Sequence, residues 1–517
     1  MARLSYGVDK VDVGITTNMP SRSVVWSSGR NISFRPGIVM KNFGKELLAT
    51  ISGIPIRAKF TYKAYDNVWR TIVCSDNKIY SYTNNFTVQQ DITPSTPPTS
   101  TYLDTWCFGV IGGMLIISNG VNPIWKWDNF SSIIVPLSES FITCKALAVV
   151  NNRLLIGNIQ EGAYSFPARI RWSDIISANK WDKNLKLDSG QVDIVSPDTS
   201  MDGIDVIQAI TNIGSRALVF TERNIWYLSD TVHPVIFTPE PLGQNIGLPG
   251  KRAYVKTPLG IFFLGQEDFY RITQAIPEPI GFRIRNSCFP NINKSRINTA
   301  FAYYKYSTRE VVFCVPTGNN VLPDTGFVYG VETDSWSIWD VDYLCYSQYF
   351  DSSNITYDTL QYGSYDSITD SRYDDIGNTG LLPSDAVGNA DGQILRLDSG
   401  YNNNGQPINA YIESGDFLFK DYQGNDLVDI NKIIYEVWPS LKPQEAMSSL
   451  MIQVGVRDNL HQDIAWSIPI AYNIGVSKNV NMRIQGKWIR VRYYTDTLNS
   501  PWILDGWKIK FDKGSSR

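Results

Sequence analysis

The feature that most constrains this chain is a repeated unit of short strands and turns. Each copy has an apolar run, a polar turn, a stronger apolar run, a second turn and an aromatic-rich run that ends on Asp or Asn. The copies occupy residues 70–85, 107–129, 145–160, 207–230, 252–274, 299–342 and, in truncated form, 388–400. They begin roughly 40 to 47 residues apart, with one wider gap of about 60, which is typical of the four-stranded blades of a β-propeller. The sequence predicts such a propeller over residues 1–404, with seven blades favoured and six as the alternative.

The strongest apolar run of each copy indicates strands rather than helices. Residues 114–117, 154–156, 218–220 and 261–264 are continuously apolar, as expected of strands that neighbouring blades bury on both faces. Runs this short between Gly, Asn and Asp turns do not form stable helices. Aromatic residues make up 13% of the chain, which also favours strands. The predicted fold class is therefore all-β.

After about residue 405 the repeat is replaced by alternating strands. They cover residues 408–419, 430–439, 449–458, 464–472, 479–496 and 500–512. In the last but one of these segments, Arg490 and Arg492 alternate with Val491 and Tyr493, which predicts a strand with one wet and one buried face. Six such strands predict a β-sandwich domain over residues 405–517.

Two segments interrupt the repeat within the propeller. Residues 87–104 are rich in Pro, Ser and Thr and are predicted to form a loop between blades. Residues 349–380 are acidic, rich in Tyr and poor in aliphatic residues, so they are predicted to form an exposed excursion. This excursion is interpreted either as a long mobile loop or as a surface that docks a partner. The candidate docking residues are Tyr362, Tyr365, Asp366, Tyr373, Asp374 and Asp375.

The content of charged residues, cysteine and histidine disfavours several classes of function. The net charge of −3 provides no electrostatic footprint for wrapping DNA or docking on an anionic membrane. No apolar run is long enough for a membrane span, and we expect a soluble chain made in the cytoplasm, without stable membrane insertion. The six cysteines are scattered singly, which favours reduced, buried thiols. The two histidines, His233 and His461, lack partner patterns and are interpreted as surface or turn residues.

One cluster combines chemically capable side chains: Arg171, Trp172, Ser173, Asp174 and, further on, Trp181. We interpret it as a structural corner on the outer strand of the third blade. The two tryptophans would pack between blades, Asp174 would accept turn amides or cap a short helical turn, and Arg171 would pair with a neighbouring blade's carboxylate. Stacking of sugars on the two tryptophans is the alternative interpretation.

The sequence also bears on glycan binding, glycan cleavage, and the binding of phosphate or calcium. Exposed aromatics such as Trp125 and Trp127 could bind a glycan. Paired carboxylates could cleave one, with Asp174, Asp340 and the acids of 366–375 as candidates. The sequence contains no phosphate-binding loop and no calcium loop, so we predict no catalytic residue, cofactor or metal.

Six segments in series resemble one family. They are 26–44 (WSSGRNISFRPGIVMKNFG), 77–94, 171–181 (RWSDIISANKW), 221–229 (TERNIWYLS), 237–272 and 486–512. In this order they resemble the nozzle or tail-hub proteins of short-tailed bacteriophages, often called packaged-DNA stabilisation proteins. The similarity extends over nearly the whole chain, whereas the 349–380 excursion has no counterpart in the family.

The resemblance implies a structural virion protein without catalytic activity. Such proteins form a homo-oligomeric ring, here expected to hold six copies, below the portal and adaptor proteins at the end of the virion tail. They retain packaged DNA, dock tail fibres or spikes and conduct DNA during ejection. A near-neutral, slightly acidic chain suits a conduit through which DNA passes without sequence-specific binding.

Overall fold

The computed structural model describes most of the chain and groups it into two compact units. The described residues are 4–20, 25–51, 53–83, 86, 88–137, 142–181, 188–195, 205–231, 236–273, 276–350, 383–417, 419–421, 423–428, 430–443 and 449–514. The sandwich unit comprises Met1–Glu46, Arg252–Asp342 and Asp398–Arg517. The five-sheet unit comprises Leu47–Lys251 and Tyr343–Leu397. Within the described residues, no helix is both long and apolar enough to cross a bilayer.

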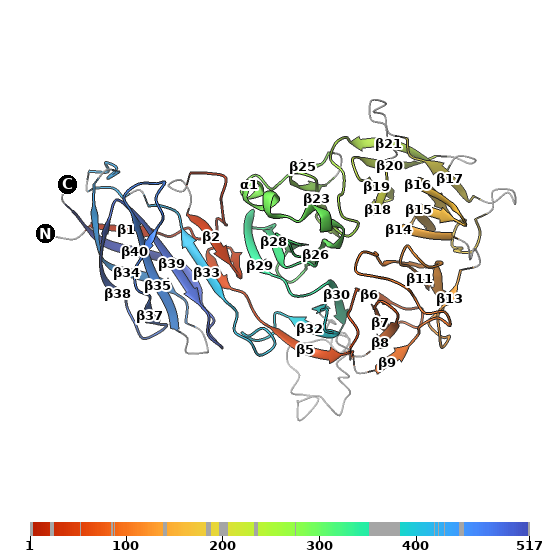
Figure 1. The fold of residues 1–517 in the computed structure, drawn as a ribbon, viewed down its shortest axis with the longest axis horizontal. Coiled ribbons are helices and arrows are strands. Elements are labelled where there is room, and N and C mark those ends of the chain that lie inside the picture. The colour runs from red at the N-terminus through yellow and green to blue at the C-terminus, as the bar shows by residue number, and fades with distance from the viewer. Residues whose placement is uncertain are drawn as a thin grey trace, which may run out of the picture. The chain divides into compact units, whose positions relative to one another are not determined.

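The five-sheet unit contains five antiparallel sheets of four strands each (Figure 1). Four of them are simple meanders: β6 (Ala58–Lys63), β7 (Trp69–Cys74), β8 (Ile79–Thr83) and β9 (Val88–Asp91); β10 (Cys107–Ile111), β11 (Met114–Ser118), β12 (Trp125–Trp127) and β13 (Val135–Pro136); β14 (Ile142–Val150), β15 (Arg153–Glu161), β16 (Tyr164–Trp172) and β17 (Gly190–Asp193); β18 (Ile207–Ile213), β19 (Arg216–Thr221), β20 (Ile225–Asp230) and β21 (Phe237–Gly243).

The fifth sheet of this unit is completed by a strand from the other end of the chain. It consists of β30 (Cys345–Phe350), β31 (Pro383–Gly388), β32 (Gln393–Leu397) and β5 (Lys45–Thr50). The repeat copy at 388–400 is therefore truncated in the sequence but complete in the structure. Its fourth strand is β5, which comes before the first blade in the chain. The backbone of Ile51, just after β5, donates to the carbonyl of Gly392 at 2.7 Å.

Neighbouring sheets of the five-sheet unit share apolar cores. The second strand of each sheet is the most buried one, and Leu115, Ile116 and Ile117 of β11 are fully enclosed. Side chains on one face of such a strand meet the preceding sheet and those on the other face meet the following one. This burial explains why these strands are continuously apolar.

The sandwich unit contains two more four-stranded sheets. They are β22 (Tyr254–Thr257), β23 (Gly260–Leu264), β24 (Phe269–Ile272) and β25 (Glu278–Pro279), and β26 (Phe301–Lys305), β27 (Glu310–Val315), β28 (Thr325–Gly330) and β29 (Ser335–Asp340). The short helix α1 (Arg285–Cys288) and two 3₁₀ turns, Phe289–Asn291 and Lys294–Thr299, connect them. Rings of Phe269, Phe313 and Trp336 pack between the two sheets, with centroids 4.7–6.3 Å apart.

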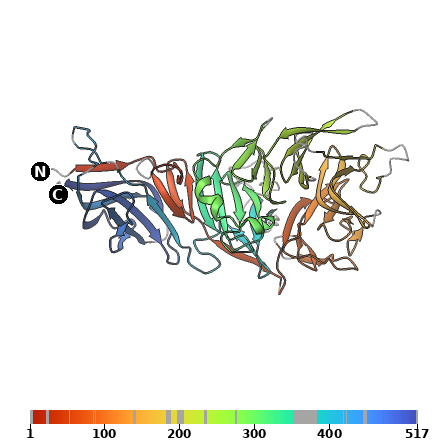
Figure 2. The same cartoon turned by 45° about the horizontal axis from the view of Figure 1, so that its top comes forward.

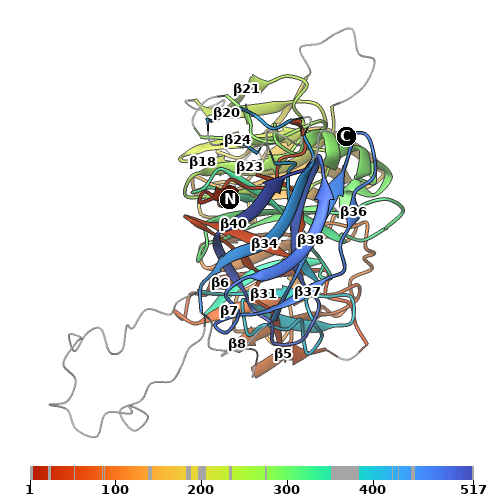
Figure 3. The same cartoon turned by 90° about the vertical axis from the view of Figure 1, so that its left-hand side faces the viewer.

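The sandwich itself has two six-stranded sheets built from both ends of the chain. Sheet A contains β1 (Leu4–Val8), β3 (Ile32–Arg35), β4 (Ile38–Lys41), β34 (Lys432–Leu441), β38 (Val480–Gly486) and β40 (Ile503–Lys513). Sheet B contains β2 (Trp26–Arg30), β33 (Ala410–Ser414), β35 (Ser449–Arg457), β36 (Ala465–Trp466), β37 (Ile470–Asn473) and β39 (Trp488–Thr495). β1 and β40 lie side by side (Figure 2), and β34 lies between β40 and β38 (Figure 3).

Within the sandwich unit, close contacts join the two six-stranded sheets of the sandwich to the blade strands β29 and β27. The backbone of Asn31 donates to the carbonyl of Ile338 at 2.8 Å, and its side chain exchanges hydrogen bonds with Asp340. Arg30 also pairs with Asp340. Arg35 holds Glu310 through two hydrogen bonds of 2.5 and 3.1 Å, and Glu310 is only 2% exposed. We call these contacts the joint.

The predicted all-β class with propeller blades and a sandwich is confirmed. The described residues form seven four-stranded sheets of the blade type, the favoured number. The division at residue 404 differs from the structure, because β1 to β4 pair within the sandwich rather than the propeller. Trp26, Ile32 and Val39 of these strands are fully buried in the sandwich core. These strands therefore belong to the sheets that bury their apolar side chains, and not to the blades that follow them in sequence.

Both segments predicted to interrupt the repeat contain strand residues. Residues 88–91 of the predicted 87–104 loop form β9, the fourth strand of its sheet. Tyr349 and Phe350, placed in the 349–380 excursion, belong to β30, and Tyr349 is buried. The remainder of that excursion lies outside the described residues.

Candidate binding face of the sandwich

The outer face of sheet B carries the most distinctive surface of the sandwich. Along β39, Ile489, Val491 and Tyr493 point into the core and are fully buried, whereas Arg490, Arg492 and Tyr494 point outward and are partly exposed. The predicted alternation of wet and buried positions is therefore confirmed. Burial raises the pKa of the Tyr493 hydroxyl well above its ordinary value. The outward tyrosine, Tyr494, is the one whose side chain meets solvent.

An apolar row crosses four strands on this face. Tyr411 of β33 lies opposite Tyr494 of β39, Tyr494 lies opposite Met451 of β35, and Met451 lies opposite Ala471 of β37. Cross-strand partners have Cβ atoms about 5 Å apart, so these side chains form a continuous strip. Exposed faces of antiparallel sheets are ordinarily polar.

A polar row runs beside the apolar row. Glu413 lies opposite Arg492, and Arg492 lies opposite Gln453. The Nε of Arg492 donates to Glu413 at 2.7 Å, and its Nη1 donates to the Gln453 amide oxygen at 3.4 Å. The Gln453 amide donates to the carbonyl of Ser467 at 2.9 Å. These contacts hold a carboxylate, a guanidinium and an amide in fixed orientations.

Trp466 lies at the sheet edge in the next row, which contains Gly455 and Arg490. It pairs with Gly455 across β35 and β36, and a Cβ at Gly455 would lie 2.9 Å from the Trp466 ring. The ring therefore covers the glycine, a known way to stabilise an edge glycine. The Arg492 guanidinium lies 4.0 Å from the Trp466 ring centroid. Beyond it, Ile468 is 84% exposed.

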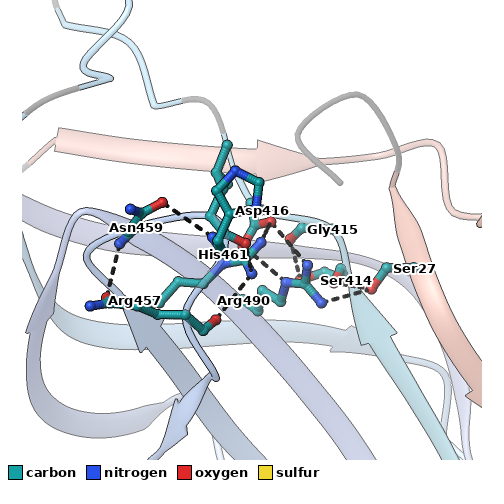
Figure 4. Close-up of polar contacts among 10 residues, drawn as sticks. Ser27, Ser414, Gly415, Asp416, Arg457, Asn459, His461 and Arg490 are labelled. Atoms are coloured by element: carbon teal, nitrogen blue, oxygen red, sulfur yellow. Dashed lines mark hydrogen bonds and ion pairs between the residues drawn. The ribbon is translucent and has the colours of Figure 1, made fainter. Parts of the chain in front are cut away.

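An ionic node borders these rows (Figure 4). The buried carboxylate of Asp416 accepts from Arg490 at 2.9 and 3.0 Å, and Arg457 also binds it. Arg490 contacts the Ser27 hydroxyl at 3.3 Å, which ties β39 to β2. Arg457 also donates to the carbonyls of Leu460 and Gln462, and so fixes the turn that leads to Trp466. The node makes this end of the face rigid.

The outer face of sheet A is different in character. Lys510 lies opposite Glu436, and Lys508 lies opposite Trp438. The Lys510 amine binds Glu436 at 2.8 Å and lies 4.4 Å from the Trp438 ring centroid. This face is dominated by charged side chains, whereas the apolar row of sheet B is uncharged from Ala471 to Tyr411 and is followed by Arg30 of β2, which lies opposite Tyr411.

The predicted structural corner packs into two different sheet interfaces. Trp172 is buried against the β18–β21 sheet, edge to face with Phe237, whereas Trp181 is buried against the β10–β13 sheet. Stacking of sugars on these two rings is therefore excluded. Trp172 ends β16, the third strand of its sheet and not the outer one, because β17 pairs outside it.

The polar members of the corner serve the same local structure. Arg171 binds Glu161 of its own sheet at 2.7 Å rather than a neighbouring blade's carboxylate, since β15 and β16 are adjacent. The Ser173 hydroxyl accepts from the Leu154 amide at 2.9 Å. Asp174 accepts from the Ile175 amide at 2.8 Å, in a turn and not at a helix.

The candidate glycan-reading tryptophans are core residues. Trp125 and Trp127 are 3% and 1% exposed and lie in the core shared by the first two sheets. Their prediction as exposed aromatics is wrong, because a residue in a strand between two blades is buried on both faces. Asp340, a candidate acid, is held in the joint by Arg30 and Asn31.

The remaining candidates are placed as follows. Tyr362, Tyr365, Asp366, Tyr373, Asp374 and Asp375 lie outside the described residues, as does His233. His461 is exposed in the turn after β35. Within the described residues, none of the six cysteines forms a disulfide, and all but Cys107 are buried. Within the described residues, no group of three or more His, Cys, Asp or Glu side chains is placed to hold a metal ion.

Some residues of this face could be predicted from the sequence. The alternation of 487–494 marked Arg490 and Arg492 as outward residues, and the same alternation in 408–414 and 449–457 places Tyr411, Met451 and Gln453 on one side of their strands. What the sequence could not provide is the pairing of β33, β39 and β35, which brings the three outward sets into rows.

Comparisons with known proteins show low similarity throughout. No family model matches the chain, and no curated protein matches it. Among solved structures, the extracellular domain of the one-component system BT4673 from B. thetaiotaomicron is 12% identical over 74% of this chain, with a TM-score of 0.38. The chain spans 44% of that protein's length. The Pan2 WD40 domain of Neurospora crassa is 9% identical over 69% of this chain and 97% of its own, with a TM-score of 0.37.

A third structure, YCF48 from Cyanidioschyzon merolae, is 10% identical over 68% of this chain and 98% of its own, with a TM-score of 0.37. At these values the similarities carry no argument about function, and the strand pairings themselves define the fold.

Proposed function

We propose that this chain is a structural protein of the tail of a short-tailed bacteriophage, its distal nozzle. Six sequence segments resemble that family in order along the chain, and propeller blades with a β-rich second domain are the architecture that the resemblance implies. In this role a ring of six copies retains packaged DNA below the portal and adaptor, docks fibres or spikes, and conducts DNA during ejection. The protein is made in the host cytoplasm and ends in the virion tail.

The observation that carries this proposal is the joint. A tube wall must transmit force between its domains, and a flexible linker cannot do this. Here the sandwich is fixed to β29 and β27 by backbone hydrogen bonds, by Asp340 and by the buried Arg35–Glu310 pair. Buried ion pairs of this kind are costly to break, so they hold one orientation.

The placement of the polar clusters favours a structural role over glycan cleavage. Asp340 binds Arg30 and Asn31, and Asp174 accepts a turn amide. The local contacts of each carboxylate account for its presence without a catalytic role.

The proposed role is tested by locating the protein in phage particles. An antibody against the purified chain would be applied to intact particles and to isolated tails, and labelled tails would be imaged by negative stain. We expect label at the tail end distal to the capsid and rings in preparations of the pure protein or of tails. A protein that stays monomeric and is absent from particles would overturn the assignment.

A further inference from the structure

We infer that the outer face of sheet B binds a neutral glycan chain. The binding face consists of the apolar row (Tyr411, Tyr494, Met451 and Ala471), the polar row (Glu413, Arg492 and Gln453) and Trp466. This inference goes beyond the structural role proposed above and does not require it. The tryptophans that the sequence offered for glycan binding, Trp125 and Trp127, are buried. The face proposed here lies in a different domain.

The size of the face fits a narrow ligand. Four strands separated by about 4.8 Å span roughly 14 Å, and three outward positions along a strand span about the same distance. The face therefore covers on the order of 200 Å², whereas a standard protein interface buries about 800 Å² on each partner. A single extended chain of sugar rings can lie along such a strip, but a stable protein contact needs a much larger area.

The charges on the face point to an uncharged ligand. Arg492 is paired with Glu413, and Arg457 and Arg490 are both paired with Asp416. Arg30, which lies opposite Tyr411, is paired with Asp340. Each guanidinium is thus oriented by a carboxylate of the sandwich unit. A phosphate or a carboxylate would have to displace one of these partners, whereas sugar hydroxyls can add to the existing pairs, because they both donate and accept hydrogen bonds.

The side chains supply both kinds of contact that a sugar ring needs. Tyr411 and Tyr494 offer apolar ring surface with a polar tip, which suits a ligand that is apolar on its C–H face and polar at its rim. Glu413 accepts hydrogen bonds, Gln453 donates and accepts, and Arg492 donates from a planar group. Because Trp466 and the ionic node hold these groups in place, little side-chain freedom is lost on binding.

The test compares matched tryptophans on the two outer faces. Purified full-length protein would be titrated calorimetrically with a panel of neutral tetrasaccharides and longer chains from bacterial envelope polysaccharides. We expect at least one to bind, and Trp466→Ala, Tyr494→Ala and Gln453→Ala each to weaken binding about tenfold or more. Trp438→Ala, which removes the tryptophan of sheet A, is expected to leave the affinity unchanged.

Three results would overturn the inference. One is that no neutral glycan in the panel binds. Another is that binding persists in the three variants of sheet B or is equally lost in Trp438→Ala. The third is that these variants release a protein partner while no glycan binds, which would make the face a protein interface. Tyr494→Ala and Gln453→Ala leave the Trp466–Gly455 contact intact, and thermal melting of each variant separates lost binding from unfolding.

Discussion

Single side chains fix the spacing between neighbouring sheets, and Trp172 shows how. Its ring lies edge to face with Phe237, with centroids 5.2 Å apart, and its indole N–H donates to the carbonyl of Asp188 at 3.1 Å. A Cβ at Gly190 would lie 2.4 Å from the same ring. The Trp172 ring thus fills the contact between two sheets and also packs against Gly190 of β17.

Replacing this ring is expected to destabilise the five-sheet unit. Trp172→Ala should lower the free energy of unfolding by about 3–5 kcal/mol, because it removes a buried aromatic and leaves a cavity. Chemical denaturation followed by circular dichroism measures the change. The control is Tyr164→Ala on the same strand, where the side chain is 73% exposed, and it should cost little. A Trp172→Ala variant with unchanged stability that failed only in assembly or binding would contradict the structural interpretation of the corner.

Lys59 illustrates the opposite case, a side chain that weakens the fold. It is 6% exposed and lies 5.1 Å from the Phe86 ring centroid, and its amine finds no hydrogen-bond partner among the residues that the structure describes. Burial lowers the pKa of Lys59 to about 8. The unfolded chain therefore binds this proton more tightly than the folded protein does.

Removing this amine is expected to stabilise the protein in a pH-dependent way. Below pH 8 the buried group must carry a charge, so Lys59→Met should raise the free energy of unfolding by about 3 kcal/mol. The gain should shrink as the pH rises from 8 towards the unfolded value near 10.5, since the folded amine is then neutral. Denaturation at several pH values measures it, with the exposed Lys63→Met as the control. A gain that is constant with pH would show that charge burial is not the cause.

Among the elements, β5 has the largest consequence for the fold. It precedes the first blade in sequence yet supplies the fourth strand of the sheet that contains β30, β31 and β32. The local pattern of apolar runs and turns predicted the blades, because each blade is a meander of neighbouring segments. It could not predict the pairings of β5, β1 and β2, or that of the β3–β4 hairpin with β40, because these partners are separated by hundreds of residues. The same limit hid the rows of the binding face, which exist only once distant strands pair.

The β5 closure depends on Gly392. This residue has a φ of +77°, and a Cβ there would lie 2.1 Å from the carbonyl oxygen of Ile51. Gly392→Ala should therefore cost about 1–3 kcal/mol for the clash beyond the cost of its backbone conformation. Gly400→Ala is the matched control, because Gly400 has a φ of +64° but no atom within 4 Å of the added Cβ. Equal losses in the two variants, measured by thermal melting, would contradict a tight closure at this turn.

For the whole molecule, the joint determines whether the sandwich moves with its neighbouring sheets. Arg35→Ala would leave the buried Glu310 with the Thr308 hydroxyl and the more distant Lys305 amine as partners, which should cost about 1.5–3 kcal/mol. We expect a separate, earlier transition of the sandwich in calorimetry and faster proteolysis of the joint segments. Arg309→Ala is the control, since its pair with Glu332 is exposed and should contribute little. A single unchanged transition in Arg35→Ala would show that the pair does not hold the domains together.

The pairing of β1 with β40 also imposes a delay on folding. Leu4 pairs with Phe511, which is made hundreds of residues later. At a synthesis rate of about 5–20 residues per second, β1 waits roughly 25 to 100 seconds for the strand that covers it. During that interval the blades can form, but the apolar residues of β1 to β4 lack the strands that complete their sheets. The nascent chain must therefore keep these strands from aggregating until β40 has been made.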